Sequence, residues 1–187
     1  KVYLAHAGVS PVPSVVTQAI HEVATAAGLD EQEVGLGDLL RVARARAAKL
    51  LGANVNEVAL IGPTTAGLSA VATGLDWQPG DEVLIYQDDF PVNVYPWLAL
   101  EARGVTVRRL QTPALGHITP KLVLEQLTDK TRLVALASCH FVSGWRIDHD
   151  AIGRELRARN ILFCLDAIQT LGAFPATVEY VDFLAAD

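Results

Sequence analysis

An acidic residue at the end of a predicted buried strand is the first candidate for chemistry in this sequence. Residues 161–165 read Ile-Leu-Phe-Cys-Leu, Asp166 follows at once, and Gln169 comes three positions later. A continuous apolar run of this kind is typical of a strand buried on both faces of a parallel sheet. A carboxylate is costly to bury without a cationic partner, and ligands of open α/β sheets bind beyond the carboxyl ends of the strands. Asp166 is therefore predicted to meet a positively charged part of a ligand, with a simple turn cap as the alternative.

A second candidate lies between a predicted strand and a predicted helix. Residues 62–67 read Gly-Pro-Thr-Thr-Ala-Gly, after the strand predicted at 57–61 and before the helix predicted at 68–75. Free backbone N–H groups at a helix start favour a phosphate, and the hydroxyls of Thr64 and Thr65 add donors. No Lys follows the last glycine, so this is not the nucleoside-triphosphate loop. An ordinary helix cap is the alternative.

Phe90 and His140 come after the predicted strands at 82–86 and 132–138. An aromatic face at this edge of a sheet can stack on a planar ring, and a His side chain can donate or accept a hydrogen bond there. A core Phe that anchors its loop and a structural His are the alternatives. The four strand ends together would suit a planar, phosphorylated, cationic heteroaromatic ligand. Pyridoxal 5'-phosphate is such a ligand, and a carboxylate against its pyridine nitrogen makes the ring a better electron sink.

The elements that must position these residues alternate from residue 57 onward, which predicts an α/β fold with a mostly parallel sheet between helices. The predicted strands are 57–61, 82–86, 105–110, 132–138, 161–165 and 181–185, and the predicted helices are 13–27, 38–51, 68–75, 92–103 with an interruption at Pro96, 120–127 and 148–159. We expect an N-terminal segment of extended chain and helices at 1–52. Residues 53–187 are expected to be part of a larger domain, because the last apolar run stops without a return element.

Composition narrows the classes of function. The chain has 187 residues, 51% of them hydrophobic and 19% charged, which indicates a globular protein. A net charge of −6 argues against a nucleic-acid or anionic-membrane surface, which would need a basic patch. The two cysteines, Cys139 and Cys164, lie 25 residues apart in apolar runs. This arrangement disfavours a zinc site or a disulfide framework, and it fits a reducing cytoplasm. No apolar run reaches the ~18 residues of a membrane span.

With these motifs in view, the sequence resembles the class V aminotransferases. These are fold-type I pyridoxal-phosphate enzymes and include cysteine desulfurases, kynureninases and isopenicillin-N-epimerase-like proteins. The resemblance covers nearly the whole chain and rests on residues 3–11, 64–68, 142–148, 166–169 and 181–187. It implies the large domain of a fold-type I transferase, a homodimer, and an amino acid or related amine as substrate.

The resemblance also implies a role for each candidate residue. Thr64, Thr65 and Ala66 would hold the phosphate, Phe90 would stack on the ring, His140 would lie near the residue that contacts the ring hydroxyl, Asp166 would pair with the pyridine nitrogen, and Gln169 would bond the ring hydroxyl. In the family, a lysine just beyond the position of Asp187 binds the cofactor covalently and moves the substrate proton. No catalytic residue is therefore assigned within this chain, and no metal site is expected.

Two departures from the family pattern bear on the reaction. Phe90 stands where cysteine desulfurases place a His, which argues against that activity. Ala5 stands where relatives often carry Asn, which puts a substrate-carboxylate contact there in doubt. The predicted function is pyridoxal-phosphate chemistry on an amino acid, as transamination, elimination or epimerisation. The alternatives are a non-catalytic α/β ligand-binding module that keeps the fold, and a nucleotide-dependent α/β protein.

Overall fold

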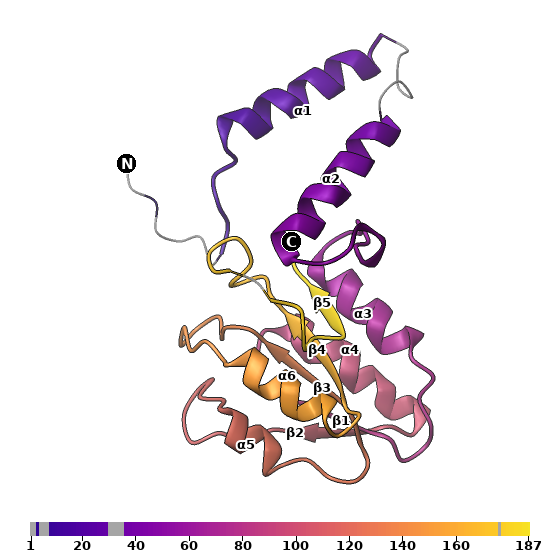
Figure 1. Cartoon of the computed structure of the whole chain (residues 1–187), viewed down its shortest axis with the longest axis vertical. Helices are drawn as coiled ribbons and strands as arrows, with labels where there is room; N and C mark the ends of the chain where they lie inside the picture. Colours follow the sequence, from indigo (N-terminus) through magenta and orange to yellow (C-terminus); the bar gives the residue numbers. More distant parts are fainter. Residues whose placement is uncertain (1–2, 4–7, 30–35, 176) are drawn as a thin grey trace. The chain divides into compact units, whose positions relative to one another are not determined.

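The computed structural model describes residue 3 and residues 8–29, 36–175 and 177–187 (Figure 1). Residues 4–7 of the predicted opening motif at 3–11, including Ala5, lie outside these described residues. The chain divides into two compact units, one of residues 1–49 with 54–60 and the other of residues 50–53 with 61–187. The first unit holds helix α1 (Ser14–Ala27), most of helix α2 (Leu36–Leu51) and the short 3-10 helix η1 (Val55–Glu57). Both α-helices were predicted within two residues of these bounds.

The second unit is built on a five-stranded sheet whose strand order is β2-β1-β3-β4-β5. Every pair of neighbouring strands is parallel, which confirms the predicted fold class. The strands are β1 (Glu82–Ile85), β2 (Thr106–Arg109), β3 (Thr131–Ala137), β4 (Leu162–Asp166) and β5 (Phe183–Ala185). The chain runs from β1 outward to β2 and then returns to build β3, β4 and β5 on the other side of β1. The strand order therefore reverses between β1 and β3, and ligands of such sheets bind beyond the strand ends at this point.

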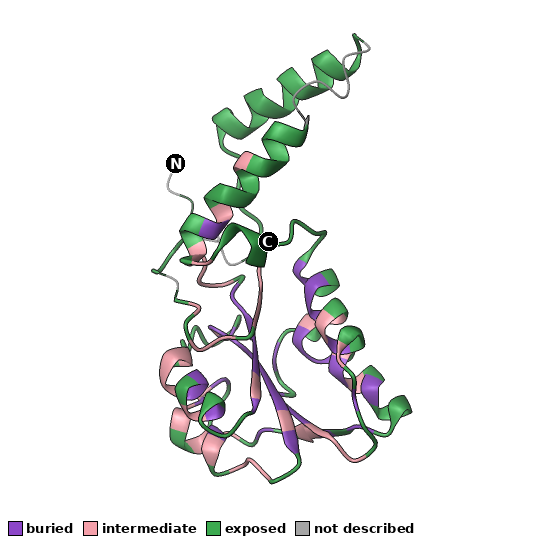
Figure 2. Cartoon of the chain, turned by 45° about the vertical axis from the view of Figure 1, so that its right-hand side comes forward, coloured by how far each residue is buried: buried purple, intermediate pink, exposed green. Residues whose placement is uncertain are grey.

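Helices cover both faces of this sheet. Strand residues alternate between the faces, so Val83 and Ile85 pack on one side and Leu84 on the other. The first face carries helix α3 (Thr64–Gly74) and the segment formed by η2 (Pro91–Asn93), α4 (Tyr95–Leu98) and η3 (Ala99–Arg103). The second face carries α5 (Pro120–Leu124) and α6 (His149–Arg157). Burial is most continuous along the central strands β1, β3 and β4, and it is lower in the outer strands β2 and β5 (Figure 2).

Two helix starts in the second unit follow local capping chemistry. The hydroxyl of Thr119 accepts the N–H of Leu122 at 3.3 Å at the start of α5. The carboxylate of Asp148 accepts the N–H of Ala151 at 3.0 Å at the start of α6. These caps fix where the helices of the second face begin.

Close approach at Gly67 sets the place of α3. A Cβ atom at this position would lie 3.0 Å from Cδ1 of Ile61 and 3.1 Å from Cβ of Ala185. The absent side chain lets the first turns of α3 pack against the last strand, β5. The start of α3 is thereby brought to the carboxyl edge of the sheet.

The predicted strand at 57–61 is wrong. Residues Val55–Glu57 form η1, and residues 58–63 have no regular structure. The Glu57 carboxylate accepts the backbone N–H of Asn54 at 2.7 Å and its side-chain amide at 3.0 Å, which closes a tight turn. This local capping overrides the apolar run that follows it.

Two helix boundaries also differ from the prediction. Helix α3 begins at Thr64 rather than at 68, because Pro63 takes an extended conformation and the helix starts directly after it. The predicted helix at 92–103 is broken into η2, α4 and η3. Its break falls at Val94, whereas Pro96 lies in the first turn of α4, where a missing N–H removes no helical hydrogen bond.

Candidate cofactor site

The candidate residues lie at the carboxyl ends of the strands, near the point where the strand order reverses. Asp89 and Phe90 follow β1, His140 follows β3, and Asp166 is the last residue of β4. Because all the strands are parallel, their carboxyl ends share one edge. The start of α3 reaches the same edge through its contact with β5.

Asp166 is a buried carboxylate whose two oxygens both accept hydrogen bonds. Asp166 is only 2% exposed. Oδ2 accepts the side-chain amide of Asn93 at 2.8 Å, and Oδ1 accepts the backbone N–H of Ile168 at 2.9 Å. Burial raises the pKa of Asp166, the two donors oppose this rise, and the nearby charge of Asp187 adds to it. A cationic ligand group at this position would favour the charged form and lower the pKa of Asp166 again.

Asp89 is a second buried carboxylate in this cluster. Its Oδ1 accepts the backbone N–H of Phe90 at 2.7 Å. Burial raises the pKa of Asp89 to about 6, against the lowering effects of the Phe90 N–H and of His140, while the charge of Asp166 raises it further. The charge of Asp166 thus acts on Asp89, which places the two carboxylates near each other at this sheet edge.

His140 links the loops that follow β1 and β3. Its Nδ1 accepts the backbone N–H of Ser143 at 3.1 Å, so the ring proton is assigned to Nε2. Nε2 then donates to the carbonyl of Asp88 at 3.0 Å. Both ring nitrogens are therefore engaged by the protein itself, and the residue is only 4% exposed. His140 braces the loop that carries Phe90, and its predicted place near the ring hydroxyl stays a prediction.

A turn at Gly116 covers the His140 ring. Its φ is +71°, and a Cβ atom there would lie 2.6 Å from His140. The N–H of Gly116 donates to the hydroxyl of Tyr86 at 2.9 Å. The loop at 111–119 is thereby fixed over the imidazole, which only a glycine permits.

The start of α3 has the features of an anion site. The backbone N–H of Thr64 donates to Oδ2 of Asp187 at 3.1 Å, so a carboxylate already takes one donor. Among the described residues, the N–H of Thr65 has no backbone acceptor. The hydroxyl of Thr64 is buried and also lacks a partner in this part of the chain. A buried hydroxyl and the backbone N–H of Thr65, at the N-terminus of an 11-residue helix, fit a phosphate group.

Phe90 is the aromatic candidate at this edge. It is 50% exposed, and its ring meets Phe141 edge-on with centroids 5.3 Å apart. This contact orients the Phe90 ring through its edge and leaves exposed ring surface for stacking. Gln169 lies half-buried in the turn that follows β4, beside Thr170, whose hydroxyl donates to Ser138 at 2.7 Å.

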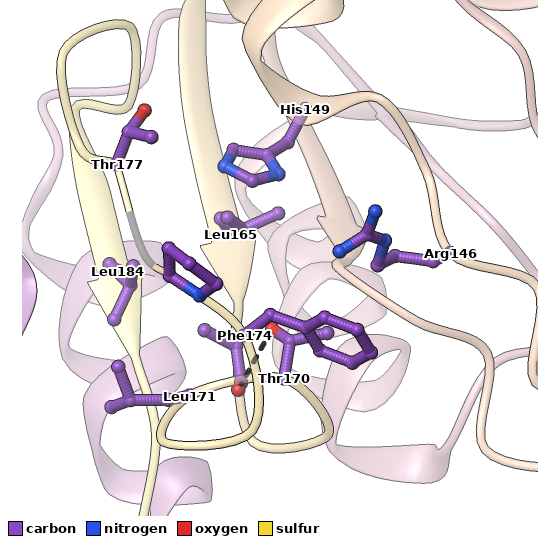
Figure 3. Close-up of a pocket in the computed structure, with 10 residues that line it drawn as sticks. Arg146, His149, Leu165, Thr170, Leu171, Phe174, Thr177 and Leu184 are labelled. Atoms are coloured by element: carbon purple, nitrogen blue, oxygen red, sulfur yellow. Dashed lines mark hydrogen bonds between the residues drawn. The ribbon is translucent and has the colours of Figure 1, made fainter.

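A separate small cavity lies beside β4 and β5, lined in part by Leu165, Leu184 and Phe174 (Figure 3). The guanidinium of Arg146 lies 4.4 Å from the centre of the Phe174 ring. The volume of about 30 Å³ suits a water molecule rather than a pyridine ring. The cofactor site is therefore not this cavity.

Asn93 was missed by the sequence reasoning, and Asp89, which directly precedes Phe90, was given no role by it. Asn93 is 73 positions from Asp166 in sequence, so nothing local indicates their contact. Its only signal was its place three residues after Phe90, on the loop that follows β1.

Within the described part of the chain, no group of three or more His, Cys, Asp and Glu side chains could hold a metal, and no helix is long and apolar enough to span a membrane.

The fold defines a doubly wound α/β protein in which a buried carboxylate and the N-terminus of a helix meet at the carboxyl edge of the sheet. Comparison with known families makes the class specific. The chain belongs to the aminotransferase class-V family, whose family model matches residues 2–186.

Known relatives agree with this assignment. A probable cysteine desulfurase of Methanothermobacter thermautotrophicus is 29% identical over 98% of this chain and 48% of its own length. An uncharacterized aminotransferase, YcbU of Bacillus subtilis, is 32% identical over 77% of this chain and 39% of its own length. The chain thus spans about half or less of these relatives.

Solved structures show the same fold at low sequence identity. The cystine C-S lyase C-DES, in complex with cysteine persulfide, matches with a TM-score of 0.88 and 24% identity, over 98% of this chain and 52% of that one. The apo cysteine desulfurase of Thermococcus onnurineus NA1 matches with a TM-score of 0.86 and 19% identity, over 98% of this chain and 48% of that one.

Proposed function

We propose that this chain is part of a pyridoxal-phosphate enzyme acting on an amino acid or related amine. One observation carries the proposal, namely that Asp187 joins the two halves of the site. Its carboxylate accepts the Thr64 N–H at the start of α3, and its charge raises the pKa of Asp166. Asp166 also pairs in register with Ala185, two residues before Asp187, so the start of α3 and the buried carboxylate lie at neighbouring strand ends, where one ligand with a phosphate and a cationic ring would contact both.

The residues of this chain would hold such a cofactor from three sides. The hydroxyl of Thr64 and the backbone N–H of Thr65 would bind the phosphate, and Ala66, whose own N–H donates to the Pro63 carbonyl at 2.7 Å, would leave room for it beside the first turn of α3. Phe90 would stack on the ring. Asp166 would keep the pyridine nitrogen protonated. The positive charge of that nitrogen would in turn offset the cost of burying the Asp166 carboxylate. When bound, pyridoxal phosphate supplies an electron sink for a substrate carbanion.

The relatives support amino-acid chemistry without fixing the reaction. Relatives and structural neighbours include cysteine desulfurases, aminotransferase-like proteins and a cystine lyase. We propose aminotransferase, lyase or epimerase chemistry, with Gln169 bonding the ring hydroxyl. We do not propose a desulfurase, because position 90, which we propose to stack on the ring, is Phe and not His.

The remainder of the enzyme is proposed to come from the parent protein. Residues 53–187 would form part of the large cofactor domain, behind the N-terminal segment at 1–52. The catalytic lysine is expected just after Asp187, and the share of the relatives' length that this chain covers supports such a continuation. A homodimer in the cytoplasm belongs to the same proposal, and the free thiols of Cys139 and Cys164 support a reducing compartment.

The test is the visible absorbance and turnover of the full-length protein with and without Asp166. We expect Asp166→Ala to abolish turnover and to weaken cofactor retention about tenfold or more, because a charged contact is lost. Asp88→Ala is the matched control, since Asp88 lies at the same edge with an exposed side chain.

Unchanged turnover in Asp166→Ala would contradict the assignment. A wild-type protein without cofactor absorbance, whose melting temperature is raised by nucleotide instead, would favour the nucleotide-dependent alternative. Cofactor binding without turnover on any amino acid would favour the non-catalytic module.

A further inference from the structure

The segment after β1 carries two functions within four residues. Phe90 presents its ring at the sheet edge, and Asn93, at the end of η2, reaches Asp166. The backbone N–H of Asn93 donates to the carbonyl of Phe90 at 2.8 Å, which closes the turn between them. One short turn thus sets the position of both the aromatic ring and the amide.

The amide of Asn93 is well placed to act on the carboxylate. Asn93 is only 2% exposed, and its Nδ2 donates to Oδ2 of Asp166 at 2.8 Å. The next residue, Val94, is a buried core residue, so the turn is anchored in the apolar layer on that face of the sheet. An amide nitrogen can only donate, and it therefore favours the charged, acceptor form of Asp166.

The two donors to Asp166 come from different elements. The Ile168 N–H belongs to the turn directly after β4 and would persist in any variant that keeps that turn. The Asn93 amide comes from the neighbouring layer of the fold and fixes the rotation of the carboxylate about its side-chain bonds. Losing it would leave Oδ2 of Asp166 without its side-chain donor.

We propose that Asn93 is a positioning residue that keeps the Asp166 carboxylate ionised and aimed at a cationic ring nitrogen. This inference rests on the proposed function, since the ring nitrogen is that of pyridoxal phosphate. Asn93 acts only through Asp166 and touches no reacting atom. The η2 turn then couples ring stacking by Phe90 to charge pairing by Asp166.

The test compares Asn93→Ala, Asn93→Asp and the control Val92→Ala in the full-length protein. Val92 lies in the same turn and is half-buried, but it makes no hydrogen bond to Asp166. Carboxyl carbon NMR of the cofactor-free protein should show the pKa of Asp166 raised in both Asn93 variants. In Asn93→Asp, which keeps the side-chain shape, the added like charge should strengthen this effect.

Cofactor binding gives the second measurement. We expect the dissociation constant of pyridoxal phosphate to rise about tenfold in Asn93→Ala, as for a lost hydrogen bond to a charged group. The pH at which the cofactor's visible band changes should shift in the Asn93 variants, whereas Val92→Ala should leave both quantities near wild type.

The outcomes separate this inference from the proposed function. A wild-type protein that binds no pyridoxal phosphate refutes the proposed function, whatever the variants do. Wild-type binding with an unchanged Asp166 pKa and an unchanged dissociation constant in both Asn93 variants refutes the positioning role alone. If Asn93→Ala does not fold, the nearly isosteric Asn93→Asp decides the matter by the same two measurements.

Discussion

Replacing Asp89 by Asn should remove a loss of stability that the buried carboxylate imposes as pH rises. The pKa of Asp89 is raised from 3.8 to about 6 in the folded protein, chiefly by burial. Between these two values the folded state keeps a proton that the unfolded chain has released. The free energy of unfolding therefore falls as pH rises through this window, and the loss is complete above about pH 6.

The size of this loss of stability follows from the difference between the pKa of Asp89 in the folded and in the unfolded chain. About two pH units correspond to about 3 kcal/mol, an upper value because Asp166 titrates in the same environment. Asn at position 89 keeps an oxygen that can accept the Phe90 N–H but carries no charge. The variant should then gain roughly 1–3 kcal/mol relative to wild type on going from pH 4 to pH 7.

Urea unfolding of the cofactor-free, full-length protein at closely spaced pH values measures this difference. Asp88→Asn is the control, because it removes a neighbouring carboxylate from an exposed position. Carboxyl carbon NMR should place the Asp89 midpoint near 6 in the wild type and lower in Asp166→Asn, which removes the repelling charge. Parallel stability curves for wild type and Asp89→Asn across this range would refute the burial argument.

Two further substitutions test the proposed phosphate site at the start of α3 and the proposed stacking of Phe90 on the cofactor ring. Thr64→Val removes a buried hydroxyl that has no partner among the described residues. The cofactor-free variant should therefore be as stable as the wild type or about 1 kcal/mol more stable, and it should bind phosphate more weakly. Calorimetric titration with pyridoxal phosphate and with inorganic phosphate checks this, and unchanged affinity for both would remove Thr64 from the site. Phe90→Ala should weaken cofactor binding with a change in stability below about 1 kcal/mol, because the side chain is half-exposed; a wild-type cofactor dissociation constant would contradict the stacking role.

The parallel sheet could be predicted because its strands carry their own signal. β3 and β4 are continuous apolar runs, and such runs are buried on both faces wherever helices cover both sides of a sheet. The run at 57–61 has the same apolar character but forms no strand. The side chains of Asn54 and Glu57 close a turn at its start, a local signal that the hydrophobic pattern conceals.

The candidate site was only partly predictable. Asp166 could be placed at a strand end from the sequence, because a carboxylate interrupts an apolar run there. The engagement of both His140 nitrogens depends on Asp88 and Ser143, and the Asp88 carbonyl comes from another strand's loop. Hydrogen-bond partners from different loops are set by how neighbouring strands align in the sheet, and the local sequence does not show this alignment.

From the sequence alone one could derive the alternation of strands and helices from β1 onward, the small residues at the start of α3, and the acidic end of β4. These features depend on periodicity and on residue type, which act locally. The tertiary structure decided that Asn93 meets Asp166 and that Asp187 meets Thr64, over separations of 73 and 123 positions. The physical reason is that parallel strands bring their carboxyl ends to one edge, where donors and charges from distant segments must satisfy one another out of contact with water.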